Sequence, residues 1–121
     1  MKSRNRSSAL VFIFAATFSL LPWLPTIALA GQTTYSCKSV DVTTFPERVH
    51  VRCSTAASGG IIFFAVPTAN NENAARILST LLAGHIAGRS LVIGYDTTDT
   101  SGTAFGCAQN DCRRLLSVGV K

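Results

Sequence analysis

The chain has 121 residues, 47% of them hydrophobic and 14% charged, with a formal net charge of +5. It is too short for two ordinary domains and too apolar for a disordered chain. Residues 31–121 hold eight of the eleven basic residues and all six acidic ones, a net charge of +2, and they contain no dense basic stripe. The composition therefore does not indicate a nucleic-acid partner.

Residues 1–30 have the parts of a secretory signal peptide. Residues 1–6 contain three basic side chains, and residues 9–21 form an apolar run. Ala28 and Ala30 supply the small side chains that a signal peptidase requires at the cleavage site. We therefore predict a cleaved signal peptide that ends at Ala30.

Cleavage before Gly31 leaves residues 31–121 as a single domain that is exported to the periplasm or secreted. The alternative is an uncleaved membrane anchor. Pro22 and Pro25 interrupt the apolar stretch, and its uninterrupted part is short for a bilayer span. No second long apolar run follows, so we expect no stable membrane insertion after cleavage.

Three strands are predicted in the first half of the domain. Residues 33–44 are rich in Thr and Val, as strands often are. Residues 48–53 alternate, which places His50 and Arg52 on the outward face of the second strand. Residues 61–66 are apolar at every position, so we expect this third strand to be covered on both faces.

A helix is predicted over residues 71–87, capped by Asn70 or Asn71 and ended by Gly88. Its apolar side chains span close to half of the helix circumference, which is wide for packing on one surface. We expect a second contact, within the chain or with another subunit. The apolar positions are Ala74, Ile77, Leu78, Leu81, Leu82 and Ile86, and the candidates for an oligomer interface are Ile77, Leu78, Leu81 and His85.

Two further strands follow the helix, at residues 91–95 and 115–120, with a polar loop over residues 96–106 between them. The element order is then three strands, one helix and two strands. This is the order of an OB-fold, a five-stranded Greek-key barrel. We predict a mainly β domain with one helix and this architecture.

Four cysteines in a small exported domain indicate two disulfides, and three pairings are possible. We prefer Cys37–Cys53 and Cys107–Cys112, because each joins near neighbours in the sequence. Strict alternation puts Cys37 and Val40 on opposite faces, so either a bulge or a sheet corner must lie between them. The spacings fit neither a redox motif nor a metal knuckle, and we predict no metal and no cofactor.

The sequence does not favour an enzyme. The two histidines, His50 and His85, lack the spacing of a hydrolase or metalloprotease motif. Asp96, Asp99 and Asp111 lie among Thr, Ser and Gly, a setting typical of turns. A small secreted enzyme is the alternative, and it would require a cleft that holds a perturbed His or Asp.

A binding protein is the remaining class. Sugars are commonly held by an aromatic face together with fixed hydrogen-bonding groups. Such residue types occur near the predicted strand ends. The ligand-binding candidates are Tyr35, Lys38, Arg52, Tyr95 and Asp96.

The order of these elements resembles the B subunits of subtilase cytotoxin and typhoid toxin. The similarity covers most of residues 35–121: Cys37-x15-Cys53, an apolar strand, a helix with Ala75-Arg76, Gly88-x-Ser90-Leu91-Val92-Ile93 and Cys107-x4-Cys112. It implies an OB-fold, a ring of five copies whose helices line the centre, and recognition of sialylated host glycans. It also implies a possible enzymatic A subunit carried on the ring.

The sequence departs from this family ahead of Cys37, where only residues 31–36 remain after cleavage. Family members have a longer segment there that holds part of their sugar site, so those residues have no counterpart in this chain. The alternative function is a stand-alone periplasmic OB-fold protein, structural or inhibitory, with no toxin partner. A neighbouring gene for an exported enzyme subunit would favour the toxin reading over this one.

Overall fold

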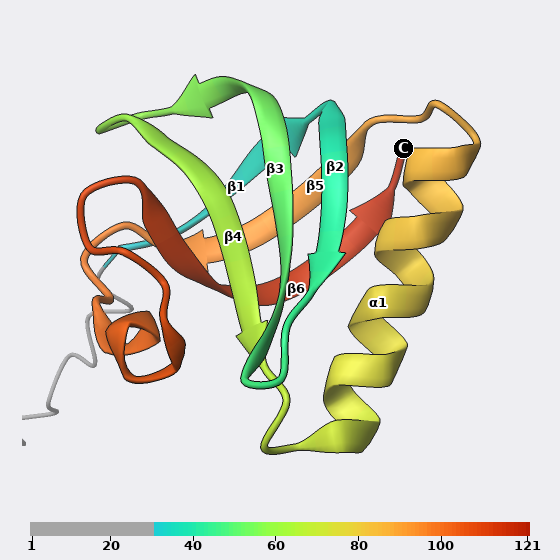
Figure 1. Ribbon diagram of the computed structural model, residues 1–121. Helices are drawn as coiled ribbons and strands as arrows, with labels where there is room; N and C mark the ends of the chain where they lie inside the picture. The colour runs from blue at the N-terminus through green and yellow to red at the C-terminus, as the bar shows by residue number, and fades with distance from the viewer. Residues whose placement is uncertain (1–30) are drawn as a thin grey trace, which may run out of the picture.

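The computed structural model describes residues 31–121, so the predicted signal peptide lies outside the described residues. This part is mainly β with one α-helix (Figure 1), and no helix in it is long and apolar enough to cross a bilayer. In chain order the elements are β1 (Gln32–Cys37), β2 (Ser39–Thr44), β3 (Arg48–Ala57), β4 (Ile61–Pro67), α1 (Asn71–Ile86), β5 (Leu91–Asp96), a short 3-10 helix η1 (Ser101–Phe105) and β6 (Cys112–Val120).

The six strands form one sheet in the order β1-β5-β6-β4-β3-β2. Neighbours are antiparallel except β4 and β6, which pair in parallel. We predicted five strands, and the sixth arises because the strand expected over residues 33–44 is interrupted at Lys38. Its two halves, β1 and β2, lie at opposite ends of the strand order, and within residues 31–121 no ladder joins them. The sheet is therefore not closed, and the five-stranded barrel is not confirmed.

The interruption lies beside the first disulfide. Cys37 is bonded to Cys53, and the pairing of β2 with β3 shifts register between Ser39 and Asp41. Val40 is left without a partner in the ladder and is 45% exposed. Strict alternation between Cys37 and Val40 allowed either a bulge or a sheet corner. The register shift lies at Val40, and the chain also passes from β1 to β2 at Lys38, beside the disulfide.

Strand β4 is covered on both faces, which confirms the prediction from its continuous apolar sequence. Phe64 and Val66 lie in the main core with buried side chains from β1, β3, β5, β6 and the helix. Ala65 lies on the opposite face, in a second small cluster with the disulfide Cys107–Cys112, and Phe63 packs against that cluster. The second predicted disulfide therefore covers the outer face of β4.

Helix α1 begins where the sequence predicts and ends one residue earlier. The side chain of Asn70 accepts a hydrogen bond of 3.0 Å from the backbone N–H of Asn73, which caps the first turn. At the other end Gly88 has a φ of +64°, a left-handed conformation that favours glycine. The buried face of the helix consists of Ala74, Ile77, Leu81 and Gly84.

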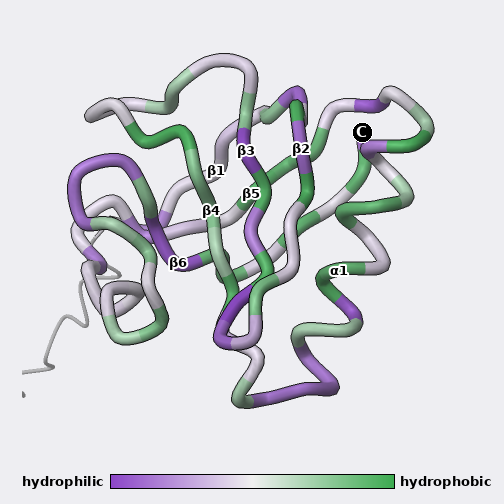
Figure 2. Tube along the Cα trace, viewed as in Figure 1, coloured by the Kyte–Doolittle hydropathy of each residue, from purple (hydrophilic) through white to green (hydrophobic). Residues whose placement is uncertain are grey.

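The helix lies close to the sheet at Gly84, where a Cβ atom would overlap the side chain of Leu91. Beside this packed face α1 leaves apolar surface exposed: Leu82 is 38% and Ile86 81% accessible. Figure 2 shows the change along the helix, from hydrophilic colour in its first turn to hydrophobic colour in its later turns. One face of the helix therefore packs in the protomer, and a neighbouring stripe does not.

We predict that Cys53→Ala lowers the free energy of unfolding by about 2–4 kcal/mol under oxidising conditions, because the cross-link over 16 residues is lost. The double substitution of Cys107 and Cys112 should cost less, since that bridge spans a separation of only 5. Urea unfolding with and without a reductant measures both effects. Equal stability of oxidised wild type and the Cys53 variant would contradict a stabilising role for this bridge.

Candidate functional site

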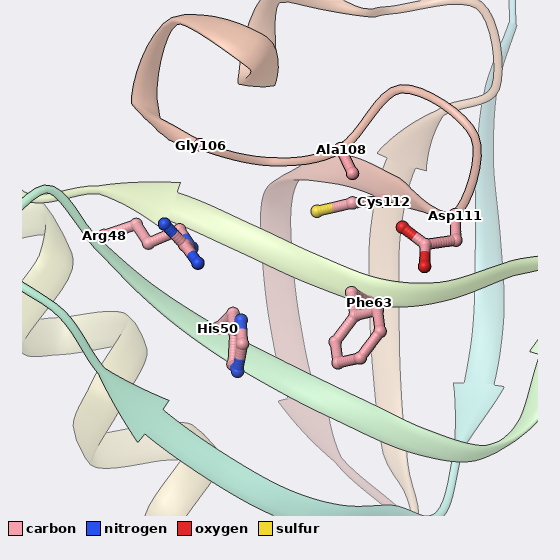
Figure 3. A pocket seen from close by; sticks show the side chains of 7 residues that line it. All are labelled: Arg48, His50, Phe63, Gly106, Ala108, Asp111 and Cys112. Atoms are coloured by element: carbon pink, nitrogen blue, oxygen red, sulfur yellow. The ribbon is translucent and has the colours of Figure 1, made fainter.

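A cavity of about 190 Å³ lies on the outer face of β3 and β4, beneath the loop that follows η1 (Figure 3). Four side chains give it chemical character, and they are Arg48, His50, Phe63 and Asp111. Gly106, Ala108 and the disulfide-bonded Cys112 complete its wall from the loop. Figure 3 shows Arg48 toward one end, Asp111 toward the other, and His50 and Phe63 between them.

The alternation of β3 places two of these side chains in the cavity. Val49 and Val51 face the main core, so Arg48 and His50 face the opposite side of the sheet. In the pairing of β3 with β4, His50 lies opposite Ala65, on the same face as Phe63 two residues away. The outward face of these strands is therefore the floor of the cavity.

Backbone hydrogen bonds fix the loop above this floor. The carbonyl of Asp111 accepts hydrogen bonds from the N–H groups of Ile62 at 2.9 Å and Phe63 at 3.0 Å. From Cys112 onward the chain pairs in parallel with β4, and the disulfide to Cys107 closes the loop. Asp111 is thus held beside Phe63 by both covalent and backbone contacts.

Arg48 is positioned without an acidic partner. Its guanidinium lies 4.1 Å from the ring centroid of Phe45, a cation–π arrangement, and Nη1 donates a long hydrogen bond of 3.4 Å to the carbonyl of Phe105. A Cβ atom at Gly106 would overlap Nη1, so the missing side chain there makes room for the guanidinium. Within residues 31–121, no ion pair involves Arg48.

His50 lies between two aromatic rings. Its centroid is 5.0 Å from that of Phe45 and 5.3 Å from that of Phe63. Burial, and then the charge of Arg48, lower the pKa of His50 below its ordinary value of 6.5, while Asp41 acts in the opposite direction. The imidazole is therefore mostly neutral at neutral pH.

The two tyrosines among the predicted ligand-binding residues lie against the core. Tyr95 is 3% exposed and packs edge-on to Phe64, with centroids 4.9 Å apart, and burial raises the pKa of its hydroxyl. Tyr35 stacks on the same phenylalanine, with ring centroids 6.1 Å apart, and its hydroxyl donates to the carbonyl of Thr55 at 2.9 Å. Tyr95 also lines a second cavity of about 210 Å³ between β1, β5 and β6, whose other lining residues are Gln32, Thr33, Thr34, Gly94, Leu116 and Ser117.

The three charged candidates are each engaged elsewhere in the protein. Lys38 donates to the carbonyl of Gly88 after α1. Arg52 forms an ion pair of 2.7 Å with Asp41. The carboxylate of Asp96 accepts two hydrogen bonds of 2.9 Å from Thr98 in a turn. The structure does not bring the five candidates together, and none of them lines the cavity at Arg48.

The predicted interface residues of α1 divide into two groups. Ile77 and Leu81 are in the core of the protomer, Leu81 with 0% exposure, so their side chains are not available to a neighbour. Leu78 packs partly against the core, and His85 Nδ1 lies 3.0 Å from the hydroxyl of Ser39. The apolar surface that α1 offers to a partner is instead made by Leu82 and Ile86, with Leu78 at its edge.

The sequence indicated that His50 faces outward, but it gave no sign of a cavity there. The missing information is tertiary: Phe63 and Asp111 reach His50 only through the pairing of β4 with β3 and β6. A cleft with a perturbed histidine was the expectation of the enzyme alternative. The cavity is lined by such a histidine, His50, together with the carboxylate of Asp111.

We expect His50 to titrate below 6.5, because burial disfavours its protonated form and Arg48 adds a second positive charge beside it. Arg48→Gln should raise the His50 midpoint, since it removes that charge, whereas Arg76→Gln on the exposed helix surface should leave the midpoint unchanged. NMR titration of the imidazole C–H signals measures the shift. A midpoint at or above the ordinary value in the wild type would contradict this geometry.

The described residues contain no group of three or more His, Cys, Asp and Glu that could hold a metal ion. The cavity at Arg48 brings together a guanidinium, an imidazole, a carboxylate and an aromatic face. No protein-family profile and no curated protein sequence matches this chain at a significant level.

Proposed function

We propose that this protein is an exported binding protein of the toxin B-subunit type, which assembles from copies of itself and recognises a glycan on a cell surface. The observation that carries the binding proposal is the cavity at Arg48. Its polar side chains are positioned by the fold yet make few hydrogen bonds within the described residues, so they are available to a ligand. Two disulfides fit an oxidising, extracytoplasmic environment.

The strand order supports the OB-fold part of the proposal. β1 and β2 are separated in the sequence only by Lys38, yet they occupy the two ends of the sheet order. If they are counted as one strand bent at Lys38, the chain has five strands with the helix between the third and the fourth. An OB-fold is a partly open five-stranded barrel with this order. A long first strand that pairs by one half with β5 and by the other half with β3 would join the two ends of the sheet.

The glycan part rests on the chemistry of the cavity. Proteins commonly hold a sugar ring by placing its apolar face on an aromatic side chain and hydrogen-bonding its hydroxyls. Phe63 provides the aromatic face, and His50 and Asp111 provide groups that can accept or donate. A volume of about 190 Å³ is below that of drug-sized pockets, which suits a single small unit such as one sugar residue.

The assembly part rests on α1. Ile86 is 81% exposed and Leu82 38%, and they extend the apolar stripe beyond what the core covers. A second copy of the chain is the occupant that we propose for this stripe. A ring of five and an enzymatic A subunit follow from the resemblance to the toxin B subunits and are part of the same proposal.

We predict that Leu82→Asp and Ile86→Asp each shift the native mass of the exported protein from oligomer toward monomer, because a buried charge without a partner is costly at an interface. Unfolding curves should change little, since both side chains are exposed in the protomer. Arg76→Asp, on the polar surface of the same helix, is the control and should leave the mass unchanged. Native mass spectrometry reads the outcome.

A glycan array tests the ligand. Hits with the wild type that are lost in a cavity variant such as Phe63→Ala would support the proposal. A monomeric wild-type protein with an empty array would contradict it and would favour the stand-alone periplasmic protein.

A further inference from the structure

We propose that the cavity is a carboxylate-binding subsite, in which Arg48 anchors the carboxylate of a small ligand and Phe63 supports the carbon body attached to it. The inference deepens the proposed function, because it assigns a chemical group of the ligand to a place in the same cavity.

The guanidinium of Arg48 is fixed in position while most of its N–H donors remain free to bind an anion. The ring of Phe45 and the carbonyl of Phe105 hold the guanidinium, and the backbone at Gly106 leaves space for it. Of the five N–H donors of the guanidinium, the structure engages one, in a long hydrogen bond of 3.4 Å. A planar fork held in place with free donors matches a carboxylate, which can accept two parallel hydrogen bonds from it.

The floor beside this anchor is aromatic. His50 and Phe63 are tilted against each other at a centroid distance of 5.3 Å, and both line the cavity. The face of Phe63 can pack against the carbon skeleton of the ligand, which an inorganic anion does not have. A carboxylate joined to a small carbon body uses both parts of the site.

The charges around His50 favour tighter binding of a carboxylate at lower pH. Arg48 and Arg52 flank it on β3, Asp41 faces it from β2, where it is paired with Arg52, and Asp111 lies across the cavity on the loop. Burial and then the charge of Arg48 lower the pKa of His50, and a bound carboxylate near Arg48 would counteract both effects. Protonated His50 and the bound anion therefore stabilise each other, and affinity should rise as the pH falls toward 5.5, where ligand carboxylates are still mostly ionised.

The test compares acids with matched neutral compounds. D-glucuronate is paired with D-glucose, and N-acetylalanine with its methylamide, and each is titrated into the oxidised, exported protein by NMR up to about 10 mM. We expect at least one acid to shift the Phe63 and His50 signals while its neutral partner binds roughly tenfold more weakly. Affinity for that acid should increase several-fold between about pH 7.5 and about pH 5.5.

Variants distinguish loss of the Arg48 contact from a general disturbance of the fold. Arg48→Gln should lower acid affinity roughly tenfold or more, and Arg76→Gln should not change it. Gly106→Ala should also lower it by displacing the guanidinium. Gly60→Ala is the matched control, because Gly60 has a similar φ of +79° but open space around its Cβ position. His50→Gln should retain binding but remove its pH dependence.

The outcomes distinguish this inference from the proposed function. Selective binding of glucuronate supports both, whereas selective binding of N-acetylalanine alone supports the carboxylate subsite and counts against a glycan ligand. Glucose and glucuronate binding equally well would overturn the subsite and leave glycan recognition standing. No binding of either acid, or acid binding that survives Arg48→Gln, would overturn the subsite.

Discussion

The structure depends on burying both faces of one strand, β4, from solvent. β4 is apolar at every position from Ile61 to Val66, and burying one side of it against the core still leaves Ala65 and Phe63 facing outward. The chain covers them with the loop closed by Cys107 and Cys112. This loop is short and does not extend over β3, so the cavity lies between the loop and the outer face of β3. The candidate site is thus a by-product of the need to bury the second face of β4.

A second constraint joins the two ends of the sheet. β1 and β2 belong to a single stretch of sequence, and the break at Lys38 allows each half to pair with a different strand. The disulfide from Cys37 to Cys53 ties this bend to β3. Because the bend is fixed covalently, the position of β3, which supplies Arg48 and His50, is tied to both halves of the first strand.

Much of the fold could be predicted from the sequence, because local patterns determine it. The alternation of residues 48–53, the capping Asn70, the terminating Gly88 and both cysteine pairs were predicted and are confirmed. The candidate ligand site could not be predicted in the same way. Residues were chosen for type and for position near strand ends, and each found a partner inside the protein, as Arg52 did with Asp41. Helix periodicity likewise identified the apolar positions but not which of them the sheet would cover, so Ile77 and Leu81 were assigned to an interface rather than the core.

The contact between Gly106 and Arg48 has an evolutionary consequence. Two independent requirements act on position 106: a φ of +86°, and space for the guanidinium. Homologues that keep the arginine should therefore keep glycine at 106. Homologues that have lost the arginine are released from the steric requirement alone, and asparagine, which tolerates a left-handed backbone, becomes acceptable there. Paired variation at these two positions would mark the lineages in which the anchor has been retained or abandoned.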